Sequence, residues 1–446
     1  MSWFIPFIDP LLRSLHYFSC LLLGLRQLID HKNLFQFWCY VLIVSLFYSK
    51  FLLSVSIFAL VFLSLFRITS SDGLGIVFNK LFFSSFTALF KSPAYLAIAN
   101  LFFVCIISGI NSQDTGEWIH QLILKIPFLA FPIIFLNRPA VSAEEYRNLY
   151  ICLIGISFIS AIQVSINYAL NYEAITYAIG SGHTIPTPTH HTRYSIMVAM
   201  AVLATIVLNI SDIKLSVVYR RVSIMVGIIL FIFLHVLSIR SGLLALYSGT
   251  FLLGVIYLIK VKRILLLVFF VMGLIAIPFI AYHTVTSFYN KVHYTMYDLK
   301  MNKEGRGENY SDSERLLSIK TGLRIITSNP ILGTGIGDLE ATVKSIYLEE
   351  YKKSIVKLPH NQFVLSTAAL GLILGFIYTF SFILPFLYRR NYYDLFLLSF
   401  FIAMTLLCLV EKPLERSSFI ALYGLMVSAG ISYNDGLRNN KVGSTH

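Results

Sequence analysis

Residues 264–281 read ILLLVFFVMGLIAIPFIA, an apolar run without a single charged side chain. A helix needs roughly 20 such residues to cross the hydrocarbon core of a bilayer. Arg221–Ser238 and Phe363–Leu387 are runs of the same kind. None of the three alternates apolar and polar residues, as a transmembrane β-strand of about ten residues would. The sequence therefore predicts an all-α, polytopic membrane protein.

The composition of the whole chain agrees with this class. Hydrophobic residues make up 57% of the chain and charged residues 13%, which is unlike a soluble domain. The net charge of +13 does not indicate nucleic-acid binding, because many Lys and Arg residues lie in short loops between apolar runs, as the positive-inside bias requires. The five cysteines lie in apolar runs, where we expect them to pack. No His or Cys spacing is typical of zinc, so we expect no metal and no cofactor.

We predict about twelve membrane-spanning helices. Residues 11–28 are expected to form either a thirteenth span or a helix in the membrane interface. Residues 78–91 look too short and too basic to cross, and we interpret them as interfacial. The predicted spans are 34–49, 51–67, 94–110, 122–137, 147–170, 193–210, 221–238, 241–259, 263–282, 361–388, 394–411 and 416–433.

Basic clusters follow every second predicted span, which places them and both chain ends on the cytoplasmic side. Two loops, 171–192 and 283–359, then lie on the outer face. The longer loop has helical patterns near 313–327 and 338–356, and loops of this length are usually functional when ordered. We divide the chain into N-terminal transmembrane helices (1–282), a partly helical periplasmic loop or cap (283–359), and C-terminal transmembrane helices with a short tail (360–446).

Three arginines are expected on the outer face, where the positive-inside bias does not account for them. Arg240 lies between two closely joined spans, Arg193 begins a span, and Arg315 lies in the first turn of the predicted loop helix. A planar guanidinium binds phosphate oxygens bidentately and keeps its proton, so together they predict a diphosphate site. Lys125, near the outer end of its span, is a further candidate, although snorkelling toward the headgroups would also account for it.

His360 is the candidate general base. It lies in Pro359-His360-Asn361, at the outer start of the span that closes the long loop. The positive end of a helix dipole favours a neutral imidazole, which can accept a proton. An interfacial histidine bonded to water is the alternative interpretation of this residue alone. The nearby Gly333-Thr-Gly335-Ile-Gly337 follows a helical pattern instead of a strand, and we interpret it as a turn.

The order of these motifs resembles the superfamily of O-antigen ligases, O-antigen polymerases and O-linked oligosaccharyltransferases. The resemblance covers about 190–375: an arginine between joined spans, a loop helix ending in Asn-Pro-Ile-Leu-Gly-Thr-Gly-Ile-Gly, and a span that begins Pro-His-Asn-x-Phe. It implies a GT-C-like membrane fold. It also implies that Arg240 and Arg315 bind a lipid diphosphate and that His360 activates the acceptor hydroxyl.

Other positions match the family less directly. His191-Thr-Arg193-Tyr-Ser resembles another basic site of these enzymes, and Asn361 lies within the histidine motif. We expect His191, Arg193 and Asn361, together with Lys125, to contact the substrate. Ile239 precedes the first arginine, where the family often has Ser.

The resemblance implies an inverting, metal-independent glycosyltransferase in the bacterial inner membrane, with its active site facing the periplasm. It would move an O-antigen glycan from undecaprenyl diphosphate to a sugar hydroxyl of lipid A–core. A polymerase or an O-linked protein oligosaccharyltransferase would share these motifs. A transporter of lipid-linked glycan is the alternative from another class, but transporters place charges near the bilayer midplane, whereas the notable cations here are expected at the outer rim.

Overall fold

A computed structural model of the chain describes residues 30–69, 75–211, 215–304 and 311–443. Eight helices within these ranges are long and apolar enough to cross a bilayer. A mostly helical protein with several helices that could span a membrane is therefore confirmed, whereas the number of twelve spans stays a prediction. The segment 11–28, expected to span the membrane or lie in its interface, falls outside the described residues.

Each of the twelve segments predicted to span coincides with one helix or with two consecutive helices. The first half of the chain contains α2 (His31–Tyr48), α3 (Lys50–Leu65), β1 (Phe66–Thr69), β2 (Gly75–Phe78), α4 (Leu81–Lys91), α5 (Pro93–Ile107), η1 (Ser108–Asn111), α6 (Thr115–Lys125), α7 (Pro127–Leu136), α8 (Ala143–Leu170), α9 (Tyr172–Gly180) and α10 (His191–Ile210). The second half contains α11 (Val217–Leu237), α12 (Arg240–Lys260), α13 (Ile264–Thr284), α14 (Thr286–Lys303), α15 (Ser311–Ser328), α16 (Leu339–Glu349), α17 (Gln362–Leu387), η2 (Tyr388–Tyr393), α18 (Leu395–Val410), η3 (Pro413–Glu415) and α19 (Ser417–Gly443).

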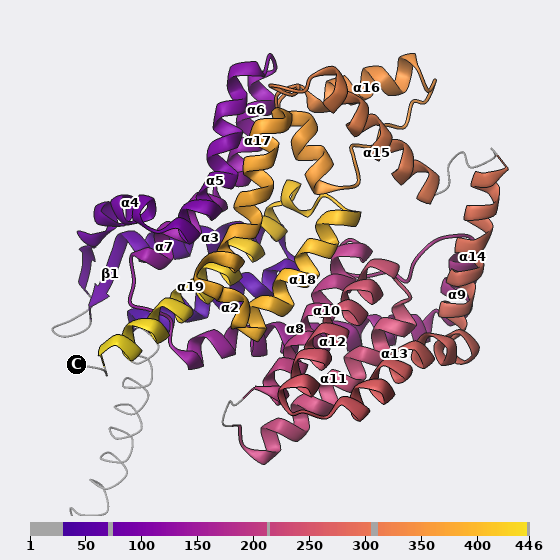
Figure 1. Cartoon of the computed structure of the whole chain (residues 1–446), viewed down its shortest axis with the longest axis horizontal. Helices are drawn as coiled ribbons and strands as arrows, with labels where there is room; N and C mark the ends of the chain where they lie inside the picture. Colours follow the sequence, from indigo (N-terminus) through magenta and orange to yellow (C-terminus); the bar gives the residue numbers. More distant parts are fainter. Residues whose placement is uncertain (1–29, 70–74, 212–214, 305–310, 444–446) are drawn as a thin grey trace, which may run out of the picture.

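A short antiparallel hairpin, β1–β2, precedes α4 and was not predicted. Its register pairs Phe66 with Phe78. The hairpin and α4 lie together at one side of the molecule (Figure 1). The segment 78–91, predicted to be interfacial, forms α4 from Leu81 onward, and its first residue, Phe78, belongs to the hairpin. The interfacial position of α4 remains a prediction.

The α10 helix is the most buried of the eight candidate spans. It packs against α8, α11, α12 and α18. A Cβ at Gly242 of α12 would lie 2.5 Å from the Cβ of Ser195 in α10, so the close approach of these two helices requires glycine there. Because this contact joins the first turns of both helices, Arg193 and Arg240 lie at the same end of the bundle.

The α17 helix is interrupted at Gly371, although 361–388 was predicted as one continuous span. Gly371 has φ 78° and ψ 176°, which a helix cannot contain. The glycine-rich segment after α15 fills the interruption: the N–H groups of Thr334 and Gly335 donate to Ala368 O (3.1 Å) and Ala369 O (2.9 Å). Broken helices at membrane depth are tolerated where other protein groups satisfy the freed backbone. The turn predicted for residues 333–337 thus also satisfies backbone groups of α17 at its interruption.

We predict that Gly371→Ala destabilises the protein by about 1–3 kcal/mol, because its backbone is left-handed and its Cβ would lie 2.1 Å from Ile331 O. Thermal unfolding in detergent measures the effect. Gly273→Ala is the matched control, since a Cβ at Gly273 of α13 meets no atom within 4 Å. Equal unfolding midpoints for the two variants would contradict this account.

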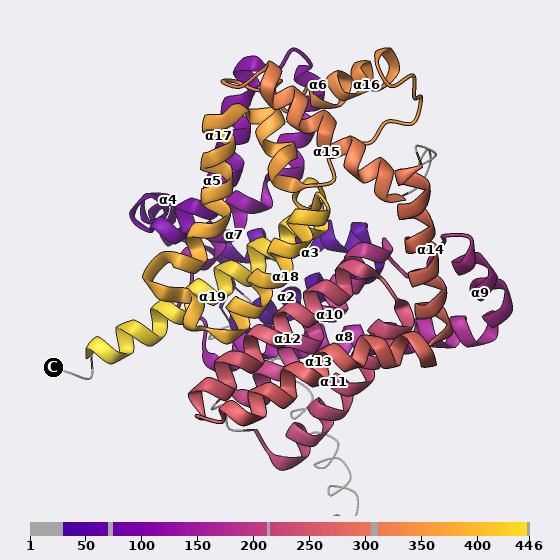
Figure 2. The same cartoon turned by 45° about the vertical axis from the view of Figure 1, so that its right-hand side comes forward.

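The predicted cap, 283–359, folds into three helices instead of two. Figures 1 and 2 both show α15 and α16 at one end of the molecule beside α6 and the start of α17. The unpredicted α14 packs against α9, α11 and α13. Asp298 and Glu314 of this cap are buried. The Glu314 carboxylate forms ion pairs with Lys353 (3.0 Å) and Lys357 (3.4 Å), which offset the free-energy cost of burying its charge.

Candidate functional site

His360 and Arg315 share one carboxylate, that of Glu411. His360 Nδ1 lies 3.2 Å from Glu411 Oε2, and Arg315 Nη2 lies 3.2 Å from Glu411 Oε1. The three side chains are partly exposed, at 20% for His360, 30% for Arg315 and 14% for Glu411. They come from the segment before α17, from α15 and from the residue after α18. The Oγ of Ser318 in α15 accepts the backbone N–H of His360 (3.1 Å), which joins two of these elements.

Glu411 is charged near neutral pH. Burial alone would raise its pKa, but the hydrogen bond from His360 and the positive charge of Arg315 lower it below the ordinary value. A carboxylate at Nδ1 favours the tautomer that carries its proton there, which leaves Nε2 as the acceptor. The pair can therefore hold an imidazole ready to take a proton from a hydroxyl at Nε2.

Sequence reasoning missed Glu411. It is a carboxylate that directly follows the apolar run of α18, in the short connection to α19. The predicted topology put that connection on the outer face, at the same end as His360. An acidic residue at the end of a span, on the face chosen for the site, was the signal that could have found it.

His191 and Arg193 lie at the start of α10, near this carboxylate. The His190 and His191 rings stack with centroids 4.3 Å apart. Glu411 and Arg315 both act electrostatically on His190 and His191, and Glu411 and Arg416 act on Arg193. Burial, followed by the charge of Arg193, lowers the pKa of His190, so this histidine is neutral at pH 7. The structure thus gathers His191 and Arg193 with His360 and Arg315.

Arg240 lines a separate cavity of about 150 Å³, together with Lys291 of α14. His360, Arg315 and Glu411 do not line that cavity. Lys291 donates to Gly182 O (3.1 Å), and so joins α14 to the loop that precedes α10. Ser238 is in the left-handed conformation, with φ 55°, and forms the tight turn between α11 and α12. This turn places Arg240 at the first position of α12, at the same end of the bundle as Arg193. Arg240 and Lys291 therefore lie at the same end of the bundle as Arg193 and Arg315.

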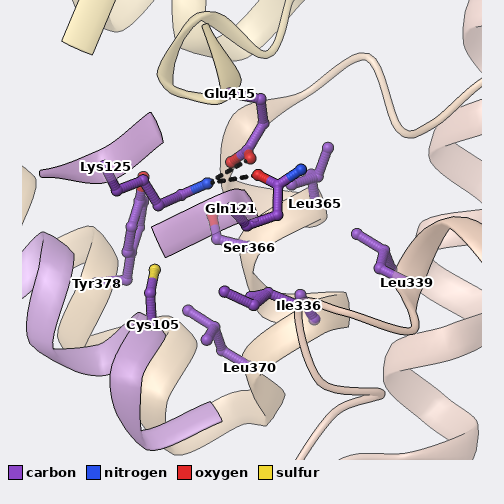
Figure 3. Close-up of a pocket in the computed structure, with 11 residues that line it drawn as sticks. Cys105, Gln121, Lys125, Ile336, Leu339, Leu365, Ser366, Leu370, Tyr378 and Glu415 are labelled. Atoms are coloured by element: carbon purple, nitrogen blue, oxygen red, sulfur yellow. Dashed lines mark hydrogen bonds and ion pairs between the residues drawn. The ribbon is translucent and has the colours of Figure 1, made fainter. Parts of the chain in front are cut away.

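Lys125 is buried at 2% exposure and has an internal partner. Its Nζ lies 2.6 Å from Glu415 Oε2 and 3.1 Å from Gln121 Oε1, at the edge of a cavity of about 40 Å³ (Figure 3). Gln362 donates to Glu415 Oε1 (3.0 Å) and accepts from the N–H of Leu414 (2.9 Å). This network binds 411–416 to the first turn of α17 and so holds Glu411 beside His360.

Asn361 caps α17. Its Oδ1 accepts from the N–H groups of Phe363 (3.0 Å) and Val364 (3.1 Å), and its Nδ2 donates to Leu409 O (3.1 Å). These bonds link the start of α17 to the end of α18. Substrate contact by Asn361 and Lys125 stays a prediction, and the contacts that the structure gives both are internal.

Comparison with known families identifies one match. A family described as O-antigen ligase matches residues 225–380. The matched range includes Arg240, Arg315 and His360, whereas Arg193 and Glu411 lie outside it. No curated protein shows a significant match. In the described part of the chain, no group of three or more His, Cys, Asp or Glu residues could hold a metal ion.

Proposed function

We propose that the chain is a member of the O-antigen ligase superfamily, whose family matches residues 225–380, and that it transfers an O-antigen glycan from undecaprenyl diphosphate to a sugar hydroxyl of lipid A–core. The observation that carries the proposal is the carboxylate of Glu411 between His360 and Arg315, 3.2 Å from each. It sets a proton acceptor next to an anion-binding group. Transfer from a lipid diphosphate needs both, one for the attacking hydroxyl and one for the leaving group.

In the proposed reaction, Nε2 of His360 takes the proton of the acceptor hydroxyl as its oxygen attacks the anomeric carbon. The bond from that carbon to the diphosphate oxygen breaks, and undecaprenyl diphosphate leaves with the electron pair. The proton ends on His360, whose positive charge the Glu411 carboxylate stabilises. Attack opposite the leaving group inverts the anomeric centre. A diphosphate is already a good leaving group, so charge stabilisation replaces a general acid.

Arg315 is suited to the diphosphate because a guanidinium has five N–H donors and Glu411 binds only Nη2. The other donors of Arg315 can bind phosphate oxygens. Its 30% exposure leaves part of the group accessible. Arg193 and Arg416 add positive charge near Glu411. Arg240 and Lys291 extend the cationic surface toward α14. We propose that the diphosphate binds along this surface, on the periplasmic face of the inner membrane.

We predict that Glu411→Gln lowers glycan transfer by about 10- to 100-fold, as removal of a carboxylate that orients a histidine typically does. An amide at this position can donate to Nδ1 and force the wrong tautomer. Steady-state kinetics check this: the loss should fall in kcat, with the KM for donor little changed. Glu411→Asp should restore part of the rate. A purely structural role would instead lower the unfolding temperature of both variants without this difference.

We predict that donor affinity falls as the pH rises from 7 to 9. Burial, opposed by Glu415 and assisted by Arg416, lowers the pKa of Lys412 to about 8. Lys412 is therefore charged at pH 7 and loses that charge through pH 8, which removes one cation near Glu411 and Arg416, beside the surface proposed for the diphosphate. The expected loss is about threefold to tenfold in affinity. Lys412→Arg should remove the pH dependence, and an unchanged dependence in that variant would contradict the assignment.

The experiment that tests the function uses purified protein with undecaprenyl-diphosphate-linked glycan, in chelator, with and without lipid A–core. Glycan on the core supports the ligase. Longer lipid-linked glycan without core would make the protein a polymerase, and transfer to Ser or Thr of a protein acceptor would make it an oligosaccharyltransferase. Bound donor without transfer to any of these acceptors would favour a transporter of lipid-linked glycan.

A further inference from the structure

A second concentration of arginines lies at the end of the bundle opposite His360. The chain path requires this: α10 runs from His191 to the residue before Ser211, and α17 runs from the residue after Asn361 to Leu387. The α18 helix returns to Glu411. Between the far ends of these helices lies a cavity of about 560 Å³, which α8, η2, α18 and α19 also line. Four arginines contribute to it: Arg147, Arg389, Arg390 and Arg438.

Two of these arginines stabilise the protein itself. Arg438 donates to Arg389 O and Asn391 Oδ1, both at 2.8 Å, and pairs with Asp435 at 3.0 Å. Arg389 lies 3.6 Å from the same Asp435 carboxylate. The Asp435 carboxylate thus forms ion pairs with both Arg389 and Arg438, and these contacts stabilise the turn after α17.

The other two arginines keep donors for a ligand. Arg147 Nε is buried and has no hydrogen-bond partner among the described residues, and its Nη2 is only within 4.0 Å of Glu144. Arg390 is exposed, and its side chain forms no ion pair with any described residue. An unpaired, buried guanidinium N–H costs free energy unless something binds it. A cavity with these donors is suited to an anion.

The turn that carries Arg390 is strained. Arg389 has φ 49° and Arg390 has φ 59°, so two consecutive residues with side chains adopt the left-handed conformation. Such residues are strained, and strain of this kind persists where the surrounding structure imposes it, often at binding sites. Cytoplasmic arginines that served only to orient spans would not require this backbone.

The walls of the cavity suit a lipid. Tyr393, Phe396 and Leu437 line it with aromatic and apolar surface, and Tyr393 is 69% exposed. Asp394 is the only carboxylate in the lining, and it accepts the N–H groups of Phe396 (3.0 Å) and Leu397 (3.3 Å) at the start of α18. The cavity lies at the ends of α8 and of the segment Gln362–Tyr393, which are both long and apolar enough to cross a bilayer, so we expect it at the depth of lipid headgroups.

We propose that this cavity binds the phosphate headgroup of an anionic phospholipid, in the leaflet opposite the candidate active site. Arg147 and Arg390 bind the phosphate oxygens, because guanidinium groups fit them bidentately. Basic pockets between transmembrane helices are the usual form of such headgroup sites. Tyr393 and Leu437 contact the glycerol and the first methylenes. The proposal does not depend on the glycan-transfer reaction.

The test is a titration of the full chain in non-ionic detergent with dioctanoyl phosphatidylglycerol, read by native mass spectrometry and by the thermal unfolding midpoint. Arg390→Gly removes one guanidinium and relieves the left-handed strain, so this variant should fold at least as well as the parent. We expect it, and Arg147→Gln, to bind the lipid about tenfold more weakly. Arg220→Gln is the matched control, because Arg220 is exposed at the same end but lines another cavity.

Three outcomes would overturn the proposal. Unchanged lipid affinity in both pocket variants would show that the arginines do not bind it, and equal weakening in Arg220→Gln would show an unspecific charge effect. Equal binding of dioctanoyl phosphatidylcholine would remove the anionic specificity. Inorganic phosphate that stabilises the parent as strongly as the lipid does, at the same concentration, would make this a soluble-anion site.

Discussion

His360→Ala is expected to abolish glycan transfer while donor binding survives. Without the imidazole, no group beside Glu411 can accept the proton of the attacking hydroxyl, and a general base is typically worth about 10²–10⁴ in rate. The donor contacts proposed for Arg315 and Arg193 do not involve this ring, so donor affinity should be retained. The measurement is single-turnover transfer with saturating lipid-linked donor, beside a separate donor-binding isotherm.

The control for this variant is His120→Ala. His120 is 61% exposed on α6 and lies 3.5 Å from Glu117, a neighbour on the same helix. The His120→Ala variant should transfer glycan at the parental rate. Unchanged turnover in His360→Ala would refute the general-base role. A joint loss of donor binding and of the unfolding midpoint would instead assign His360 a structural role in holding Glu411.

Arg315→Lys is expected to lower donor affinity and turnover together, by about 10²-fold in kcat/KM. An ammonium is a compact point charge and does not reproduce the planar fork that reaches Glu411 and a phosphate at once. Loss of one preorganised donor to a developing charge typically costs about 10²–10³. Kinetics at varied donor concentration, with the direct isotherm, separate the two contributions.

Arg324→Lys is the matched control for Arg315→Lys. It lies on the same helix, α15, is 51% exposed, and pairs with Glu350 away from the site. Its effect on kcat/KM should be small, because exposed ion pairs contribute little. Parental kinetics in Arg315→Lys would contradict the diphosphate role, and a lowered unfolding midpoint with normal donor affinity would reduce Arg315 to an ion-pair partner of Glu411.

The helices could be predicted because each depends on its own residues. In lipid, Ile264–Ala281 can satisfy its backbone N–H and C=O groups only by forming a helix, and the same holds for the other long apolar runs. Polar segments gave weaker predictions: α14 was missed because Thr286–Lys303 has no clear apolar stripe. The interruption at Gly371 was also missed. It depends on N–H donors from residues 334–335, which no local pattern around Gly371 reveals.

The candidate site was predicted in part. His360 and Arg315 lie in recognisable motifs, and the structure joins them through Glu411. Lys125 was predicted from its position near the outer end of its span and Asn361 from its place in the histidine motif, and neither signal distinguishes a ligand contact from an internal one. The structure places Lys125 on Glu415 and Asn361 on the start of α17. Both support the backbone that carries His360 and Glu411.

Length and hydrophobicity are local properties, so the apolar helices and the cations expected at one rim follow from the residues of each segment. Which groups meet at that rim depends on how the helices pack. Glu411 is 51 residues from His360 and 96 from Arg315, and its side chain reaches both because α15, α17 and α18 pack together. The same packing brings Arg147 and Arg390 to one cavity at the opposite end. Contacts between distant segments depend on how whole helices fit, and no stretch of sequence contains that information.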